Sequence, residues 1–255
     1  MRPVGPGRLQ IARVLGGALG SIRRNPAAFF LLAVIAGGIS FSLWALGARP
    51  EPGPEQDLLA IIQDATAIAA IFSPLITFPL LQGAAIHAAG MDLAGRRAPF
   101  RDCVRAGLSR YMTLLQMLGV TIVGFVIGVG LVIPAIWTVS ALAVVGPVSA
   151  LETPDLDLVL RRSSLLTRGN RLRILALVLL VVFLTLVFGV LLIVAQEALR
   201  PFAGDGVVVL VASMGSSLAA LLAATTTAAL YFELQRIVGH SSPDVLVAAA
   251  EAMAS

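Results

Sequence analysis

The side chains in this sequence with the strongest capacity to bind a ligand are arginines, and a group of them lies in one short stretch. Residues 158–180 read LVLRRSSLLTRGNRLRILALVLL, and the arginines in this stretch are Arg161, Arg162, Arg168, Arg171 and Arg173. A guanidinium group stays protonated and binds phosphate or carboxylate through paired hydrogen bonds. The cluster therefore has the chemistry of an anion site, of a nucleic-acid contact, or of a basic segment that holds a membrane helix at the lipid phosphates.

Composition favours the membrane among these roles. The 255 residues are 58% hydrophobic and 13% charged, whereas about a quarter of the residues in a soluble domain are charged. All 18 basic residues are arginine, and the formal net charge is +4. A chain this apolar has too little polar surface to cover itself in water. We therefore expect anionic lipid headgroups, and no nucleic acid, as the partners of these arginines.

The lengths of the apolar runs predict six transmembrane helices, because about 20 apolar residues are needed to cross the hydrocarbon core. Residues 112–151 contain no charged side chain, and one helix of that length would be about 60 Å long, twice the thickness of the core. They are therefore expected to form two spans joined by a turn. The expected spans are residues 27–47, 58–86, 112–129, 134–151, 174–196 and 207–232.

The distribution of arginines predicts the orientation of these spans. If the N-terminus is cytoplasmic, every arginine except Arg49 and Arg200 falls in a cytoplasmic segment. Cytoplasmic loops of membrane proteins carry an excess of basic residues. We therefore expect a multi-pass protein of the bacterial inner membrane with both termini in the cytoplasm.

Three of the basic segments also have the pattern of an amphipathic helix, and each precedes a pair of spans. Residues 9–24, 100–111 and 155–168 place aliphatic side chains on one face and most arginines away from its centre, which is typical of a helix that lies in the membrane interface. The third helix is expected to begin with Thr153 as its N-cap. The arginines expected to contact headgroups are Arg23, Arg24, Arg101, Arg105, Arg161, Arg168, Arg171 and Arg173.

The predicted fold is therefore all-α, with interfacial helices and spans in a 2+2+2 arrangement. Residues 1–236 are expected to form a single transmembrane domain, and residues 237–255 a cytoplasmic tail. A protein partner or association with further copies of the chain is compatible with this fold.

Arg162 departs from the amphipathic pattern, because it falls in the middle of the apolar face of its helix. A lone charge at such a place is costly and calls for a partner. Glu152 and Glu233 end the fourth and sixth expected spans at the same membrane level, so either is a candidate for a buried ion pair with Arg162. The alternatives are that Arg162 extends to the headgroups or that it belongs to an anion site.

Three segments of the chain resemble YciC-like bacterial membrane proteins and the membrane domain of glycerophosphoryl diester phosphodiesterases. They are residues 158–180, the segment IPAIWTVSALAVVGPVSALE at 133–152, and AALYFELQR at 228–236. The resemblance covers about residues 90–236 and departs from the family pattern at Leu172 and Gln235. It implies a six-helix bundle of the inner membrane; only the membrane module is expected here, without a phosphodiesterase domain.

The sequence contains no familiar catalytic or metal-binding motif, so we expect no enzymatic activity and no cofactor. Polar or helix-bending residues within the spans, namely Pro74, Pro79, Thr225 and Thr226, are the candidates for a transport path or a kink. The leading hypothesis is a non-enzymatic protein of envelope or lipid homeostasis, or a membrane assembly partner. The alternatives are a transporter or flippase of a lipid-like or small amphipathic molecule and, last, a lipid-modifying enzyme without a recognisable motif.

Overall fold

The computed structural model describes residues 9–47, 65–93, 95–129, 142–152 and 155–238, and every regular element in these ranges is an α-helix. Long apolar runs form the longer helices, and amphipathic segments form the shorter ones. In chain order the helices are α1 (Ile11–Arg24), α2 (Pro26–Gly47), α4 (Ala65–Leu93), α5 (Phe100–Ser109), α6 (Tyr111–Val129), α8 (Val145–Leu151), α9 (Leu156–Thr167), α10 (Arg171–Leu199) and α11 (Asp205–Val238).

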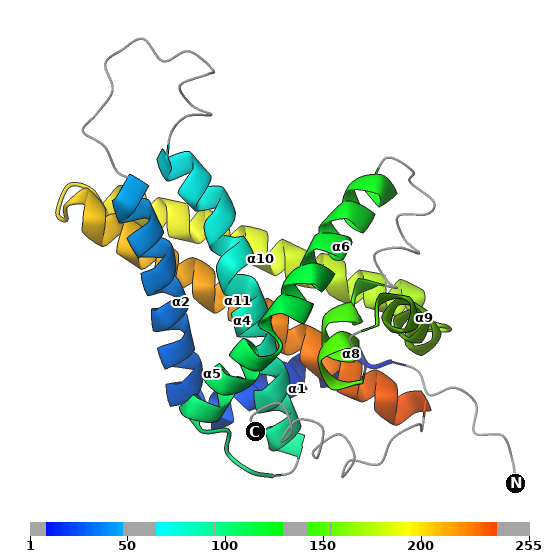
Figure 1. Ribbon diagram of the computed structural model, residues 1–255. Helices are drawn as coiled ribbons and strands as arrows, with labels where there is room; N and C mark the ends of the chain where they lie inside the picture. Colours follow the sequence, from blue (N-terminus) through cyan, green and yellow to red (C-terminus); the bar gives the residue numbers. More distant parts are fainter. Residues whose placement is uncertain (1–8, 48–64, 94, 130–141, 153–154, 239–255) are drawn as a thin grey trace, which may run out of the picture.

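The centre of the molecule is formed by α2, α4 and α11, which pack against one another (Figure 1). Alanine and other small residues on their contact faces allow the helices to approach closely. At Gly37 of α2, an added Cβ would lie 3.0 Å from the backbone of Met214 on α11. This closeness explains why α2 and α11, far apart in the sequence, share a buried surface.

The short helices pack at one end of these central helices. α1 lies against α11, so the N-terminal helix covers the C-terminal one, and α5 lies across α4. A Cβ added at Gly107 of α5 would lie only 2.6 Å from the Leu80 carbonyl oxygen, and one added at Gly83 would lie 2.7 Å from the Cα of Gly107. The two glycines therefore permit backbone contact where α5 crosses α4.

Helix α10 is the most exposed of the long helices. Its principal neighbour is α11, and most of its leucine, valine and phenylalanine side chains are exposed. Among the described residues, three helices are long and apolar enough to cross a membrane, namely α10, α11 and the Pro26–Ala45 part of α2. The chain is therefore an all-helical protein with helices of membrane-spanning length, and the exposed side chains of α10 are of the kind that contact lipid tails.

The other expected spans are seen in part. α4 begins at Ala65, and residues 58–64 of the second expected span lie outside the described residues. Of the fourth expected span, 134–151, the described part contains only the short helix α8, and residues 130–141 lie outside it. The expected tail after residue 236 is outside as well, except that α11 continues to Val238.

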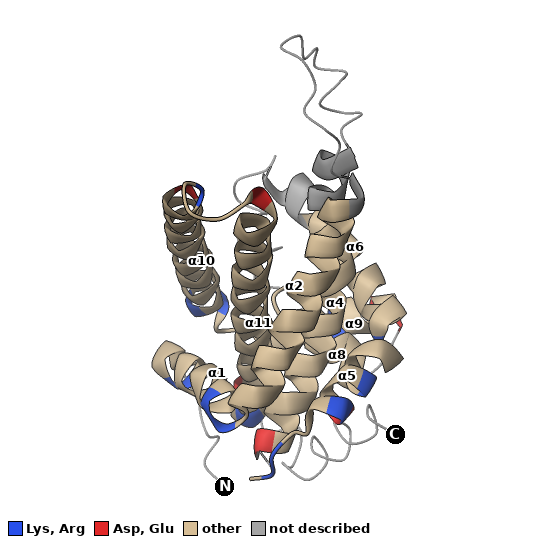
Figure 2. Cartoon of the chain, turned by 90° about the vertical axis from the view of Figure 1, so that its left-hand side faces the viewer, with Lys and Arg blue, Asp and Glu red and all other residues tan. Residues whose placement is uncertain are grey.

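Charged residues gather at one end of the bundle, which we call the basic end. In Figure 2 most blue segments lie toward the end formed by α1, α5 and the start of α10, and the α10–α11 turn at the opposite end carries both colours. That turn contains Glu197 and Arg200, which form an ion pair of 3.4 Å, and Asp205 at the start of α11. The elements that carry the candidate site residues of the sequence therefore meet at the basic end.

Candidate functional site at the basic end and the pocket beside it

Arg162 of α9 lies beside Glu152, the residue at which α8 ends. Arg162 Nε is 2.8 Å from Glu152 Oε2, and the two side chains are 28% and 24% exposed. The pair is therefore partly buried, and of the two carboxylates considered for a buried ion pair with Arg162, Glu152 is the one in contact. Arg162 reaches the rim because the face of α9 that packs inward is formed by Val159, Ser163 and Leu166, next to Arg162 rather than centred on it.

The second oxygen of Glu152 binds α11. Glu152 Oε1 accepts a hydrogen bond of 2.9 Å from the Tyr231 hydroxyl and another from Gln235 Nε2. Gln235 Nε2 also lies 3.1 Å from the Tyr231 hydroxyl oxygen. One carboxylate thus holds three helices together, because its donors come from α9 and α11 while it closes α8.

The three segments named for the expected family resemblance meet at Glu152. Glu152 ends the segment 133–152, and it contacts Arg162 of the segment 158–180 and Tyr231 of the segment 228–236. Gln235, which departs from the family pattern, nevertheless donates to the same carboxylate. Sequence reasoning named Gln235 only as a difference. Its spacing of four residues from Tyr231 puts the two side chains on one face of α11, but no local pattern shows that both reach Glu152, 79 and 83 residues earlier in the chain.

Glu233, the other carboxylate proposed for Arg162, binds a different arginine. Glu233 Oε1 is 2.9 Å from Arg13 Nη1 on α1, and its Oε2 is 3.9 Å from Arg236 Nη1. Arg24, at the end of α1, forms an ion pair with Asp92 near the end of α4. Hydrogen bonding to Asp92 raises the pKa of Arg24 above its ordinary value. The two pairs tie α1 to α11 and to α4.

Two buried asparagines, which sequence reasoning missed, also join separate segments at the basic end. Asn170 Oδ1 accepts 3.0 Å from the backbone N–H of Leu9, and Asn25 Oδ1 accepts 3.0 Å from that of Ala98. Each asparagine immediately precedes a long apolar helix, and each accepted N–H lies two residues before an amphipathic helix. That position directly before a span was the available signal, since asparagine is common at helix starts.

The arginines expected at headgroups divide into two groups. Arg23, Arg101, Arg105, Arg161 and Arg168 are exposed. Arg24 is exposed too and pairs with Asp92. Of the two half-buried arginines, Arg171 Nη2 lies 3.3 Å from Ser164 Oγ, and Arg173 Nη1 donates 2.9 Å to the Leu9 carbonyl. Arg171 therefore attaches the start of α10 to α9, and Arg173 attaches it to the segment that precedes α1.

The start of α9 differs from the expected one. Asp155, rather than Thr153, is the N-cap, and its Oδ1 accepts from the N–H groups of Asp157 at 3.0 Å and Leu158 at 3.4 Å. The helix ends before Gly169, whose φ of +88° favours glycine. Residues 153 and 154 lie outside the described residues.

The candidate kink residues lie within helices that run without interruption. α4 continues through Pro74 and Pro79, and the Thr77 hydroxyl donates 2.8 Å to the Ser73 carbonyl. Thr225 is fully buried and donates to the Leu221 carbonyl. Thr226 donates 2.8 Å to the Leu222 carbonyl and lines a pocket that the sequence did not reveal.

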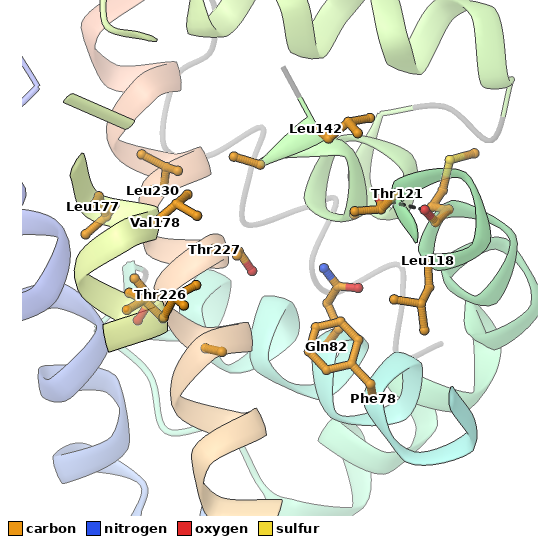
Figure 3. Close-up of a pocket in the computed structure, with 16 residues that line it drawn as sticks. Phe78, Gln82, Leu118, Thr121, Leu142, Leu177, Val178, Thr226, Thr227 and Leu230 are labelled. Atoms are coloured by element: carbon orange, nitrogen blue, oxygen red, sulfur yellow. Dashed lines mark hydrogen bonds between the residues drawn. The ribbon is translucent and has the colours of Figure 1, made fainter. Parts of the chain in front are cut away.

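This pocket has a volume of about 280 Å³ and lies between α4, α6, α8, α10 and α11. Its wall is mostly aliphatic, and the polar side chains on it are Gln82, Thr121, Thr226 and Thr227. Figure 3 shows Gln82 projecting between Leu118 and Thr121 of α6 on one side and Thr227 of α11 on the other. Four helices and the α8 segment converge on this space, so no single stretch of sequence predicts it.

Within the described residues, no group of three His, Cys, Asp or Glu side chains is placed to hold a metal ion. Comparison with protein-family models, with curated proteins and with solved structures found no match for this chain. The class of protein is therefore defined by the architecture itself: an all-helical chain with helices of membrane-spanning length, a charged end and an apolar pocket.

Proposed function

We propose that the chain is a non-enzymatic, six-span protein of the bacterial inner membrane, similar to YciC-like proteins, that contacts anionic lipid through its basic end. In this arrangement α1, α5 and α9 lie on the cytoplasmic leaflet, and both termini are cytoplasmic. Its role in the cell would be in envelope or lipid homeostasis, or in the assembly of a membrane partner.

One observation carries this proposal: exposed leucines and exposed arginines share a face on the short helices. On α5, Leu108 is 61% exposed and follows Arg101 and Arg105 by seven and three residues. On α9, Leu158 is 54% exposed and precedes the exposed Arg161 by three. Residues three, four and seven apart lie on one side of a helix. Water is a poor solvent for such a face, whereas an interface places leucine among acyl chains and arginine among phosphates.

The arginines that remain exposed identify the groups to test. Arg101 of α5, Arg161 of α9 and Arg168 at the end of α9 are exposed, and each is on or next to a helix that presents leucine. The control is Arg200, exposed at the opposite end, where it pairs with Glu197. Each Arg→Glu change alters the net charge by the same amount at either end, so the loss of lipid preference is compared per substituted arginine, which isolates position.

The experiment measures lipid selectivity. The wild-type chain and the triple variant Arg101→Glu/Arg161→Glu/Arg168→Glu are reconstituted in vesicles of phosphatidylcholine and phosphatidylglycerol, and the motionally restricted fraction of each spin-labelled lipid is compared. The triple variant is expected to lose most of the preference for phosphatidylglycerol, because each arginine near anionic lipid contributes about 1 kcal/mol. Arg200→Glu should retain the preference; an equal loss per substituted arginine in the two variants would contradict the proposal.

A second function, transport or flipping of a lipid-like molecule, is favoured by the position of Thr226 on the wall of the pocket. Transport predicts flux of a fluorescent lipid in vesicles containing the chain, and loss of that flux when the pocket is filled by Val181→Phe. Lipid selectivity at the basic end without flux across a panel of lipids favours the first function.

A further inference from the structure

The pocket between α4, α6, α10 and α11 contains one polar side chain, Gln82, whose hydrogen-bonding groups are not paired with any described residue. Gln82 is only 8% exposed, lines the pocket and makes no hydrogen bond to a described residue. The hydroxyls beside it differ, because Thr121 and Thr227 donate to carbonyls of their own helices at 2.7 and 2.8 Å. In Figure 3 the Gln82 amide points into the open space.

The surroundings of this amide define the chemistry of a ligand. A buried amide without a partner costs about 1–3 kcal/mol, so a bound group that pairs with it is stabilising. None of the described residues that line the pocket is charged, and the wall contains leucine, valine, methionine and phenylalanine. A charged ligand group would therefore be left without a counterion. The volume of about 280 Å³ is roughly twice that of the ~150 Å³ cavity that accepts benzene.

The depth of Gln82 indicates where such a ligand comes from. Gln82 precedes Asp92 by ten residues on α4, and Asp92 binds Arg24 at the basic end. Ten helical residues span about 15 Å, which is half of a hydrocarbon core about 30 Å thick. This step rests on the membrane arrangement proposed above. At this depth there is no bulk water to pair with the amide, and the molecules that reach it are dissolved in the lipid.

We infer that the pocket binds an uncharged, lipid-soluble molecule whose single hydroxyl or carbonyl group hydrogen-bonds the Gln82 amide. The apolar body of the ligand contacts the aliphatic side chains of α6, α10 and α11, including Met117, Leu177 and Leu230. An amide both donates and accepts, so a hydroxyl and a carbonyl are each accommodated.

Gly146 lies next to the Gln82 amide, so a substitution at Gly146 gives a second way to test the role of that amide. The Gln82 amide lies directly against it, since a Cβ added at Gly146 would be 2.1 Å from Gln82 Nε2. Gly146→Ala therefore forces the end of the Gln82 side chain to turn away without removing the amide. Because the displaced atom is the end of a flexible side chain, the helices need not move.

The experiment uses two photoreactive probes on the full chain in detergent micelles: a diazirine-labelled long-chain alcohol and the diazirine-labelled alkane of the same length. Cross-linked residues are mapped by mass spectrometry. The wild-type chain is expected to be labelled on the pocket faces of α6, α10 and α11. Gln82→Leu and Gly146→Ala should each reduce labelling by the alcohol about fivefold, the effect of losing one neutral hydrogen bond, and leave labelling by the alkane unchanged.

A filled pocket provides the steric test. Val181→Phe, on the pocket wall of α10, should abolish labelling by both probes, whereas Val190→Phe, on the exposed side of α10, should change neither. Unchanged pocket labelling in Val181→Phe, or an equal loss of both probes in Gln82→Leu and Gly146→Ala, would overturn the inference. If Gln82→Leu fails to fold, Gly146→Ala alone tests whether the Gln82 amide binds the alcohol probe. Micelles contain neither a bilayer nor anionic lipid, so this result is independent of the lipid-selectivity result.

Discussion

Tyr231 and Glu152 are 79 residues apart in the chain, and the Tyr231 hydroxyl donates a hydrogen bond of 2.9 Å to Glu152 Oε1. The same carboxylate binds Arg162 through its other oxygen. The end of α8 is therefore held to α9 by charge and to α11 by a phenol that is itself fully buried. Hydrogen bonds to an ionised carboxylate are about twice as strong as those between neutral groups.

Arg162→Ala is expected to destabilise the protein by about 1–3 kcal/mol, because it leaves a partly buried carboxylate without its counterion. Arg161→Ala, one residue away and exposed, should cost less than about 0.5 kcal/mol. The measurement is the free energy of unfolding in detergent. Equal effects of the two substitutions would contradict a structural role for the Arg162–Glu152 pair.

Coupling within this network can be measured with a double-mutant cycle. Tyr231→Phe should cost about 1 kcal/mol on its own, and less when Glu152 is already alanine, since the acceptor is then gone. A coupling energy near zero would show that the hydrogen bond between them does not contribute to stability.

Asn170→Ala and Asn25→Ala are expected to free different backbone amides. Asn170→Ala should speed hydrogen exchange at Leu9 and leave Ala98 unchanged, and Asn25→Ala should do the reverse, because each asparagine accepts from one of these N–H groups. Each variant is the control of the other. Faster exchange at both amides in both variants would indicate general loosening instead.

Gly107→Ala should destabilise the crossing of α5 and α4 by about 1–3 kcal/mol, because the new methyl group would meet the Leu80 carbonyl oxygen. Gly119→Ala on α6 is the matched control, since a Cβ there has no atom within 4 Å, and alanine favours a helix over glycine by up to about 1 kcal/mol. Thermal unfolding should show a lower melting temperature for Gly107→Ala and an equal or higher one for Gly119→Ala than for the wild-type chain.

Cys103, fully buried on α5, should resist thiol reagents in the folded protein. Burial raises the pKa of the Cys103 thiol to about 12, and the thiolate is the reactive form. Its labelling by maleimide should therefore stay slow from pH 7 to about pH 9, whereas the unfolded thiol, with a pKa of about 8.5, reacts quickly. Rapid labelling of the folded chain would contradict burial of this group.

The same pKa shift predicts a pH dependence of stability. Above about pH 8.5 the unfolded thiol loses its proton while the folded thiol keeps it, so the unfolded state binds fewer protons and the free energy of unfolding falls as pH rises toward 12. The melting temperature of the wild-type chain should therefore decrease between pH 8 and pH 10.5 by more than that of Cys103→Ala.

Local patterns were sufficient to locate most of the helices. α1, α5 and α9 lie within the residues expected for the amphipathic helices, apart from short differences at their ends, and α2, α10 and α11 correspond to apolar runs. Hydrophobic periodicity and run length depend only on neighbours along the chain. Even so, the N-cap of α9 is Asp155 and not the expected Thr153. Both residue types cap helices and they are two residues apart, so the sequence alone does not fix at which of them the helix begins.

The sequence by itself determined an apolar, all-helical chain with arginines concentrated in a few segments, and it left Glu152, Glu233, lipid headgroups and an anion site open as partners of Arg162. Only the tertiary structure decided that Glu152 is that partner, that Glu233 binds Arg13 instead, and that Gln82 projects into a pocket. The physical reason is that helix formation follows from contacts within a few residues, whereas ion pairs and pockets depend on the rotation and crossing of helices that are far apart in the chain.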